Sequence, residues 1–280
     1  MYPITYNIPV DLFPAHAGRC VIVRVADPSE LALKLSDADM GKVQYFQILS
    51  PDIEPDNIET LSAWGRDIPV DIVIDDPVAQ FPQLYNFAKL VDKHPIRASI
   101  AVTAGFGKAV KLALALRFAV KLEIGQPAPE LIEELNEVLD LYMHGRHVSQ
   151  PVEFFHSIFL SEYRQEEVSM WMVQEDDPDH FRFVTDDGFE MLSRRFAATG
   201  HGQADGSQGP IDITAGAPGE PECTSCEFFG SCRGYFKWPE SDYDCSGVKS
   251  IFRTIADAAN ELRENVGVLA ATQGGRSNDA

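Results

Sequence analysis

The chain has 280 residues, 45% of them hydrophobic, so it is long enough to bury a core without help from disulfides. It carries 43 acidic against 23 basic side chains, a formal net charge of −20. This excess of acid argues against nucleic acid or an anionic membrane as a partner, because both are bound through basic side chains. A peptide or protein partner with a basic face is favoured instead.

The N-terminal segment has no basic stretch followed by an unbroken apolar run, as a secretory signal would. The longest apolar stretch, residues 109–122, is interrupted by three basic side chains and is too short to span a bilayer. We therefore expect a cytoplasmic protein. In a reducing cytosol, closely spaced cysteines favour metal binding over disulfides.

Strands and helices are predicted to alternate through the first half of the chain. The expected strands are 20–25, 43–48, 70–74, 97–102 and 118–124. The expected helices are 28–35, 56–64, 78–91, 107–116 and 129–142, with a further helix beginning near residue 151. Regular alternation of a strand and a helix is typical of parallel β/α units. An α/β fold is therefore predicted, a partial (β/α) barrel of parallel strands, with an open parallel sheet as the alternative.

The pattern changes after residue 165. Residues 168–174 and 181–185 are expected to be two strands of a hairpin around the acidic turn EDDPDH. Residues 197–220 are rich in glycine and poor in large apolar side chains, which predicts a linker or a long loop. The predicted organisation is a β/α domain over 1–165, a hairpin and connecting helix over 166–196, the glycine-rich segment 197–220, a cysteine-rich module with a closing helix at about 248–263 over 221–266, and a disordered tail over 267–280.

Charge is unevenly distributed along the chain. Residues 93–122 hold six basic side chains and no acid, whereas residues 123–190 hold seventeen acids against three arginines. Solvated helix faces explain most such runs. A docking surface for a basic partner is the alternative.

Four of the five cysteines lie within 23 residues, in a C-x2-C-x5-C-x12-C pattern. They are Cys223, Cys226, Cys232 and Cys245. Crowded thiolates repel one another unless a cation or cluster compensates their charge, so the pattern predicts a metal site. Zinc and iron–sulfur clusters both accept four cysteines. The fifth cysteine, Cys20, lies in an expected strand and is interpreted as a core thiol.

The cysteine pattern resembles the end of a SPASM domain, the auxiliary-cluster module found at the C-terminus of many radical SAM enzymes that modify peptides. In that module the second auxiliary [4Fe-4S] cluster uses the first three cysteines of a C-x2-C-x5-C-x3-C run and one final, distant cysteine. The remaining cysteine of the run, which serves the first auxiliary cluster, is replaced here by Phe236. The resemblance implies one [4Fe-4S] cluster on Cys223, Cys226, Cys232 and Cys245, with zinc as the runner-up.

The body lacks the motif that defines radical SAM chemistry. Such enzymes carry CxxxCxxC after their first strand, where one iron stays free for S-adenosylmethionine. Here the loop after the first expected strand, ADPSELALKLSDADM, has no cysteine. The resemblance therefore implies a degenerate relative that does not use S-adenosylmethionine. It would be an accessory subunit that binds a peptide substrate or a radical SAM enzyme, with electron transfer as a further role.

Carboxylates at expected strand ends support a different hypothesis. Asp75 and Asp76 follow strand 70–74, and Glu123 lies near the end of strand 118–124. Because this edge of a β/α barrel forms the active site, a stand-alone enzyme could use them as acid and base, beside a structural zinc or iron–sulfur module. Helix capping is the ordinary explanation for such residues.

The segment TAGFGKAVK places Gly105, Gly107 and Lys108 where an expected strand passes into a helix. Backbone N–H groups at such a point favour an anion. It is not a P-loop, because Ala109 stands where serine or threonine is required. An anion site is one interpretation and a plain turn is the other.

Overall fold

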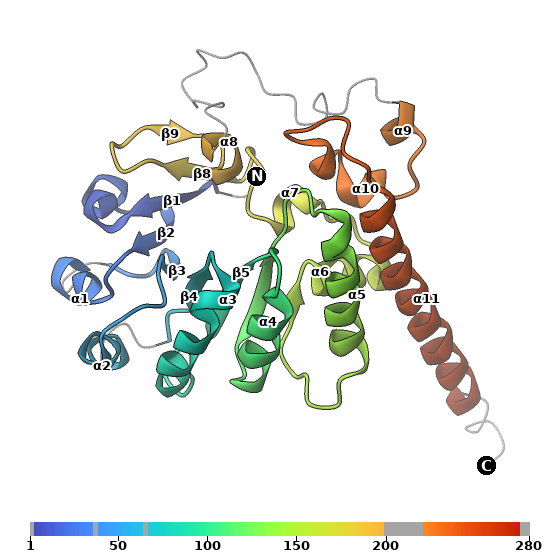
Figure 1. Ribbon diagram of the computed structural model, residues 1–280, viewed down its shortest axis with the longest axis horizontal. Coiled ribbons are helices and arrows are strands. Elements are labelled where there is room, and N and C mark those ends of the chain that lie inside the picture. Colours follow the sequence, from blue (N-terminus) through green and yellow to red (C-terminus); the bar gives the residue numbers. More distant parts are fainter. Residues whose placement is uncertain (1–2, 36–38, 64–66, 199–220, 275–280) are drawn as a thin grey trace.

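The computed structural model describes residues 3–35, 39–63, 67–198 and 221–274. Within them the fold is α/β, built on one nine-stranded sheet of order β7-β6-β5-β4-β3-β2-β1-β8-β9 (Figure 1). The strands are β1 Thr5–Pro9, β2 Cys20–Val25, β3 Val43–Ile48, β4 Val70–Ile74, β5 Ile96–Ala101, β6 Ala119–Glu123, β7 Val152–Glu153, β8 Phe181–Val184 and β9 Glu190–Met191. All neighbouring strands are parallel except β8 and β9. Strands β1 to β7 lie in chain order, which is consistent with a partial β/α barrel.

Helices cover the convex face of this sheet (Figure 1). They are α1 Ser29–Leu35, α2 Pro55–Ala63, α3 Pro77–Gln80, the 3-10 helix η2 Phe81–Leu90, α4 Phe106–Ala115 and α5 Pro129–His144. The 3-10 helix η1 Val10–His16 follows β1, and α6 Phe155–Arg164 follows β7. The remaining helices are α7 Met170–Val173, α8 Arg194–Ala198, α9 Pro221–Thr224, α10 Phe229–Cys232, η3 Tyr235–Lys237 and α11 Ser246–Gly274. Helix α11 packs against α6 and α5.

The predicted β/α units are confirmed closely. Strands β2, β3 and β4 have the expected bounds, and β5 and β6 differ by one residue at each end. The expected helix 78–91 instead divides into α3 and the 3-10 helix η2. Pro82 stands at the start of η2, where it has no N–H to donate to the turn before it.

Three expectations outside these units are wrong. Residues 168–174 do not form a strand: they contain α7, whose Ser169 hydroxyl accepts a hydrogen bond from the N–H of Met172 at 3.2 Å. The hairpin partner of β8 is β9, and β8 joins the sheet beside β1. Helix α11 continues to Gly274 rather than ending near residue 263. Residues 267–274, the first part of the expected disordered tail, belong to α11, and residues 197 and 198 of the expected linker belong to α8. The rest of the linker, 199–220, and of the tail, 275–280, lies outside the described residues.

The first strand of the sheet is β1, which the sequence analysis did not predict. It is short and ends at Pro9, so its apolar alternation is brief. The segment that follows β1, residues 10–19, contains no cysteine either. The absence of CxxxCxxC after the first strand therefore holds for the observed strand order as well.

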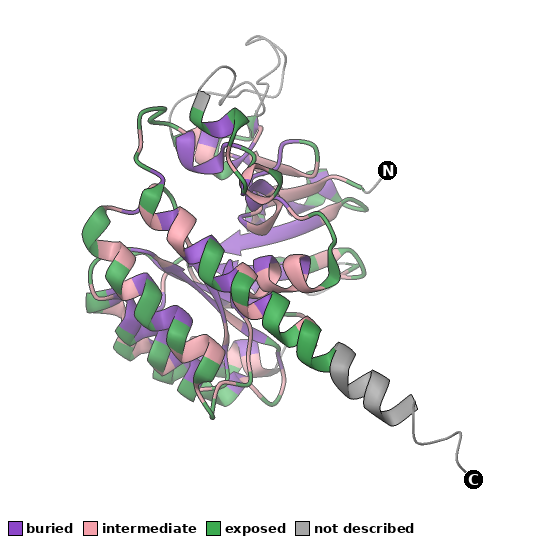
Figure 2. Cartoon of the chain, turned by 90° about the vertical axis from the view of Figure 1, so that its right-hand side faces the viewer, coloured by how far each residue is buried: buried purple, intermediate pink, exposed green. Residues whose placement is uncertain are grey.

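The two faces of the sheet have opposite character because strand side chains alternate. Figure 2 shows that the strands consist largely of buried residues. The convex-face side chains are buried against the helices: Val21, Val23, Val25, Phe46, Ile48, Val70, Ile72, Ile74, Ile96, Ala98, Ile100, Val120 and Leu122. Each large aliphatic side chain buried in this way stabilises the fold by roughly 1.5–3 kcal/mol. Concave-face positions between them carry polar groups: Asn7, Arg24, Gln47, Asp71, Arg97, Ser99 and Lys121. The sheet thus places a polar surface opposite its helical layer.

No helix in the described part of the chain is both long enough and apolar enough to cross a membrane.

Candidate functional site

The four clustered cysteines line one pocket, here called the cysteine pocket. It encloses about 390 Å³ outside the protein atoms, part of it open to solvent. Cys223 and Cys245 are buried, and Cys226 and Cys232 are half-buried. The other lining residues are mainly aromatic or basic: Phe228, Phe229, Phe236, Phe252, Lys237, Lys249, Val248, Gly234 and Glu222. The structure therefore brings together the four residues that the sequence pattern singled out.

Tight turns shape the chain around these thiols. The N–H of Cys226 donates to the carbonyl of Cys223 at 3.1 Å, which closes the CxxC turn. After Cys232 the backbone is left-handed at Arg233, with φ 47°, and at Gly234, with φ 75°. This reversal turns three consecutive backbone N–H groups, of residues 234–236, toward the Cys232 sulfur. Burial raises the pKa of the Cys232 thiol, and these N–H groups oppose that effect.

Two basic side chains, Lys237 and Lys249, line the cysteine pocket. The Lys237 ammonium is buried and lies 2.8 Å from Glu222, whose other carboxylate oxygen lies 2.6 Å from Lys249. Burial raises the pKa of the Cys245 thiol to about 12, although the charge of Lys237 acts in the opposite direction. Burial likewise raises the pKa of the Cys223 thiol, so the pocket favours the neutral form of both thiols unless a cation is bound. Among the described residues, no group of three or more His, Cys, Asp or Glu side chains converges as for a single metal ion.

The second polar region is a network on the concave face of the sheet. Arg97 donates to Asp71 at 2.9 Å from Nε and to Glu175 at 3.0 Å from Nη1. The second oxygen of Glu175 accepts from the Tyr45 hydroxyl at 2.7 Å and from Lys121 Nζ at 3.0 Å. Gln47 and Ser99 add hydrogen bonds to Asp71 at 2.9 and 2.8 Å. The network joins strands β3 to β6 to the segment after α7.

Glu175 holds the loop after α7 in the concave face. Its backbone is left-handed, with φ 61°, a conformation that costs a non-glycine residue about 1 kcal/mol or more. Burial alone would raise the pKa of Glu175, but the charges of Arg97 and Lys121 hold it well below its usual value. The neighbouring Gln174 side chain bonds the backbone of residues 122 and 124. The carboxylate therefore stabilises a loop conformation that is unfavourable by itself.

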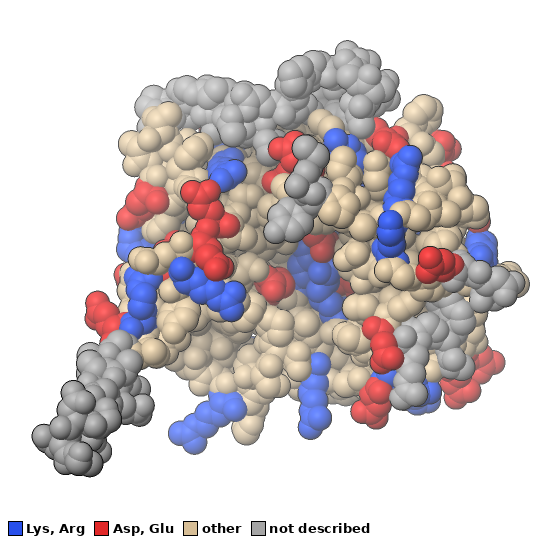
Figure 3. Space-filling view, turned by 180° about the vertical axis from the view of Figure 1, so that it is seen from behind, with Lys and Arg blue, Asp and Glu red and all other residues tan. Residues whose placement is uncertain are grey.

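A larger cavity, here called the concave pocket, opens beside this loop. It encloses about 1000 Å³ outside the protein atoms, part of it open to solvent. Figure 3 shows charged side chains of both signs in the hollow at the centre of one face. Its walls come from β1, β2, β3 and β6, from residues 174–176, from β8 and α8, and from Tyr235 and Pro239 beside the cysteine pocket.

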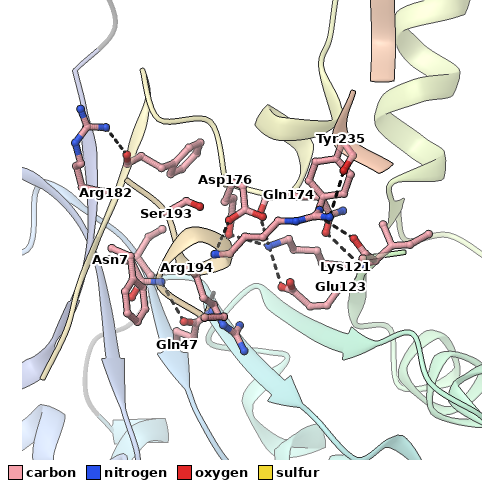
Figure 4. Close-up of a pocket in the computed structure, with 18 of the residues that line it drawn as sticks. Asn7, Gln47, Lys121, Glu123, Gln174, Asp176, Arg182, Ser193, Arg194 and Tyr235 are labelled. Carbon is pink, nitrogen blue, oxygen red and sulfur yellow. Dashed lines mark hydrogen bonds and ion pairs between the residues drawn. The ribbon is translucent and has the colours of Figure 1, made fainter. Parts of the chain in front are cut away.

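Asp176 and Glu123 line the same part of this pocket (Figure 4). Burial raises the pKa of Asp176 to about 6; Lys121 lowers it and Glu123 raises it further. Glu123 lies 2.9 Å from Lys121 Nζ, and about 26% of its side chain is exposed. Arg195 stacks 3.9 Å over the Tyr235 ring and donates to the carbonyls of Tyr235 and Trp238. The pocket therefore places Asp176, whose pKa is raised, near Glu123 at the carboxyl end of β6.

The three strand-end carboxylates predicted from sequence are not brought together. Glu123 lines the concave pocket, but Asp75 and Asp76 do not. Asp76 caps α3, accepting from the N–H groups of Val78 and Ala79 at 3.1 and 3.0 Å. Asp75 is exposed and lies 3.7 Å from Arg194. Asp76 is therefore a helix-capping residue, which is the usual role of a carboxylate just before a helix.

The N–H groups proposed as an external anion site already have an internal partner. Gly105 and Gly107 donate to the two carboxylate oxygens of Glu134 at 3.0 and 2.8 Å. Glu134 projects from α5 and supplies the negative charge that the N-terminus of α4 favours. Gly105 is left-handed, with φ 83°, and a Cβ there would lie 2.8 Å from Val78. The glycines therefore serve the packing of α4 against α3 and α5, and neither they nor Lys108 line either pocket.

The buried polar residues of the loop after α7 were not predicted from the sequence. Glu175 and Asp176 were assigned to a hairpin turn in the acidic run, yet both are buried or half-buried. Arg97 and Lys121, counted in a basic run, point into the same network. The sequence did contain a signal for this network: Asp71, Arg97 and Lys121 each interrupt an otherwise apolar strand. Cys20 is half-buried at the start of β2, away from both pockets.

No protein-family model, curated protein or solved structure matches this chain, so its assignment depends on the residues and geometry described above.

Proposed function

We propose that this chain is an iron–sulfur protein that acts as an accessory subunit in peptide maturation. It resembles a radical SAM/SPASM enzyme that lacks the catalytic cluster. Four cysteines from three separate segments line one pocket, and this single observation carries the proposal. Cys223, Cys226, Cys232 and Cys245 would hold one [4Fe-4S] cluster, which supplies one-electron chemistry when bound.

The surroundings of the thiols fit such a group. Thiolates are the preferred ligands of iron–sulfur clusters, and a thiolate-ligated cluster is anionic. Three N–H groups at Cys232 and the ammonium groups of Lys237 and Lys249 would offset that charge. Phe228, Phe236 and Phe252 would exclude water from the site. Zinc on the same four thiols is the alternative, because structural zinc sites with four cysteine ligands are common.

The position of the cysteine pocket supports a role in peptide binding or in electron transfer. One short segment, residues 234–237, separates it from the concave pocket. Phe236 and Lys237 line the cysteine pocket, whereas Tyr235 lines the concave pocket. A cluster would therefore lie one peptide segment away from a molecule bound on the concave face.

Two observations favour an accessory role over radical chemistry. The segment after β1 has no cysteine, so no protein thiols there would hold a cluster for S-adenosylmethionine. Glu175 also occupies the centre of the concave face, where it bonds Arg97, Lys121 and Tyr45. The net charge of −20 favours a peptide or partner enzyme with a basic face.

Anaerobic purification followed by iron, sulfide and zinc analysis tests the cluster. About four iron and four sulfide per chain are expected, because four thiolates complete a [4Fe-4S] cluster. Cys232→Ser and Cys245→Ser should each lose most of the iron, whereas Cys20→Ser should retain it because Cys20 is outside the pocket. Stoichiometric zinc without sulfide would overturn the cluster assignment.

Glu123 and Asp176 favour one second candidate, a stand-alone enzyme. A buried carboxyl group whose pKa is raised to about 6 can donate or accept a proton near neutral pH. We would incubate the purified protein with basic peptides, with and without reductant, and measure product masses. A mass change lost in Asp176→Asn would favour the enzyme, and unchanged masses would favour the accessory role.

A further inference from the structure

The charged side chains that line the cysteine pocket carry one net positive charge between them. They are Glu222, Lys237 and Lys249. The carboxylate of Glu222 lies between the two ammonium groups, 2.8 Å from Lys237 and 2.6 Å from Lys249. The exposed Asp244 does not line the pocket. One carboxylate therefore neutralises one of the two ammonium groups, and the second positive charge is left facing the thiols.

The two lysines differ in how far they are buried. The side chain of Lys237 is 4% exposed, whereas that of Lys249 is 28% exposed. Salt and water screen an exposed charge strongly and a buried charge much less. Lys237 ends the 3-10 helix η3, directly after the backbone N–H groups that point toward the Cys232 sulfur. The buried ammonium of Lys237 is therefore the stronger electrostatic neighbour of the cysteines.

A shared carbonyl group places this ammonium beside a cysteine sulfur. The carbonyl oxygen of Tyr243 accepts from Lys237 Nζ at 2.7 Å and from Cys245 Sγ at 3.8 Å, so the two donor atoms lie no further apart than the sum of these distances. Burial raises the pKa of the Cys223 and Cys245 thiols, and the charge of Lys237 is the largest influence in the opposite direction. In the described part of the chain, Nζ bonds only Glu222 and Tyr243, which leaves one of its three N–H donors for a thiolate.

We propose that Lys237 sets the reduction potential of the cluster held by the four cysteines, by stabilising its reduced form. Reduction by an external one-electron donor adds one negative charge to the cluster and its thiolates and breaks no bond. A fixed cation nearby favours that added charge and so raises the potential. This inference rests on the proposed [4Fe-4S] cluster and names the residue that tunes it. Lys237 acts through its charge and touches no substrate.

A redox titration of the reconstituted full chain tests this role, with dithionite as the electron donor and the visible absorbance of the cluster as the readout. Lys237→Met removes the charge and keeps most of the length of the side chain. At a fixed ambient potential the ratio of reduced to oxidised cluster should fall at least about tenfold, which for a one-electron couple is a shift of about 59 mV to lower potential. High salt should leave most of this shift in place, because the charge is buried.

Two further variants separate charge from packing. Lys249→Met removes the same charge from a more exposed position, so it should change the ratio less than about threefold, and high salt should abolish that change. Lys237→Arg keeps the charge and should keep the potential of the parent chain. Iron and sulfide are measured in every variant. If Lys237→Met binds less than a full cluster, Lys237→Gln replaces it, because the amide keeps an N–H donor for the Tyr243 carbonyl.

The outcomes distinguish this inference from the cluster itself. A complete cluster whose potential falls only when the charge at position 237 is removed supports both. With a complete cluster, equal shifts in Lys237→Met and Lys249→Met would overturn the role of Lys237, and so would a shift in Lys237→Arg as large as that in Lys237→Met. A parent chain without iron and sulfide would instead overturn the cluster, and the role of Lys237 with it.

Discussion

The polar network on the concave face and the cysteine pocket differ in how far the protein itself satisfies their polar groups. On the concave face, Asp71, Arg97, Glu175 and Lys121 form a continuous chain of ion pairs. In the cysteine pocket the thiols face largely apolar walls, and burial raises the pKa of Cys245 to about 12. The concave network can hold its shape without a ligand. The cysteine pocket gains most from a bound metal centre, because four deprotonated thiols without one would repel one another.

The largest expected effect is therefore the response to iron and sulfide. Reconstitution should raise the free energy of unfolding by about 4 kcal/mol when free ligand exceeds its dissociation constant about a thousandfold. The physical reason is that a cluster would bind the folded pocket and not the unfolded chain. Chemical denaturation of the same preparation before and after reconstitution measures the difference.

Cys232→Ser should abolish this stabilisation, whereas Cys20→Ser should show it in full. Equal stabilisation of both variants would mean that the cluster binds elsewhere. The cysteine pocket would then not be the site whose stability depends on metal.

The next largest effect tests whether the polar network on the concave face is stable without a ligand. Glu175→Gln should lower the free energy of unfolding by about 3 kcal/mol, because it removes one charge from a buried, hydrogen-bonded ion-pair network. The substitution keeps the volume of the side chain and one carbonyl acceptor for Tyr45 or Lys121. Denaturant unfolding of the metal-free protein measures the loss.

Glu166→Gln is the matched control, since Glu166 is exposed and lies 3.9 Å from Arg164. Exposed pairs of this kind contribute less than about 1 kcal/mol. A Glu175→Gln variant as stable as this control would show that the network contributes little to folding.

Asp176 offers a smaller effect with a distinct pH signature. Its pKa is raised from 3.8 to about 6, so the folded state binds the proton more tightly than the unfolded state. Stability associated with this group is complete below about pH 4 and falls as pH rises to about 6. Asp176→Asn removes the dependence and should raise the free energy of unfolding at pH 7, relative to the parent chain, by about 2 kcal/mol.

Unfolding at pH 4, 5, 6 and 7 measures that difference, which should grow across the interval. Asp177→Asn, one residue further along the same loop, provides a comparison at a position outside both pockets. A constant difference between Asp176→Asn and the parent chain at all four values would contradict the raised pKa.

Each pocket could be predicted only as far as its residues lie close together in the sequence. The four clustered cysteines lie within 23 residues, so their spacing alone indicated a shared site. Strands β2 to β4 were also predictable, because apolar β-branched runs are local signals. The concave pocket could not be predicted in this way. It joins Asn7, Lys121, Asp176 and Tyr235, which only the order of the strands brings together.

Local signals also misled where tertiary contacts decide the structure. The acidic turn around Glu175 is typical of an exposed hairpin, but pairing with Arg97 and Lys121 draws it into the sheet. The glycines before α4 are typical of an anion site, but Glu134 occupies it. In each case the deciding partner lies more than 25 residues away, so no window of sequence contains both.

The smallest expected effect concerns Glu134, whose carboxylate accepts hydrogen bonds from the N–H groups at the start of α4. Glu134→Ala removes the carboxylate from the N–H groups of Gly105 and Gly107 and should lower the free energy of unfolding by about 1 kcal/mol. The vacated N-terminus of α4 should then favour an external anion, so phosphate should stabilise Glu134→Ala more than the parent chain. Thermal unfolding with phosphate, at ionic strength matched with chloride, measures both changes. An equal response of the two proteins to phosphate would show that Glu134 does not fill this site. The Glu133→Ala variant, altered at the exposed neighbour on α5, should behave as the parent chain does, because its side chain reaches no N–H group of α4.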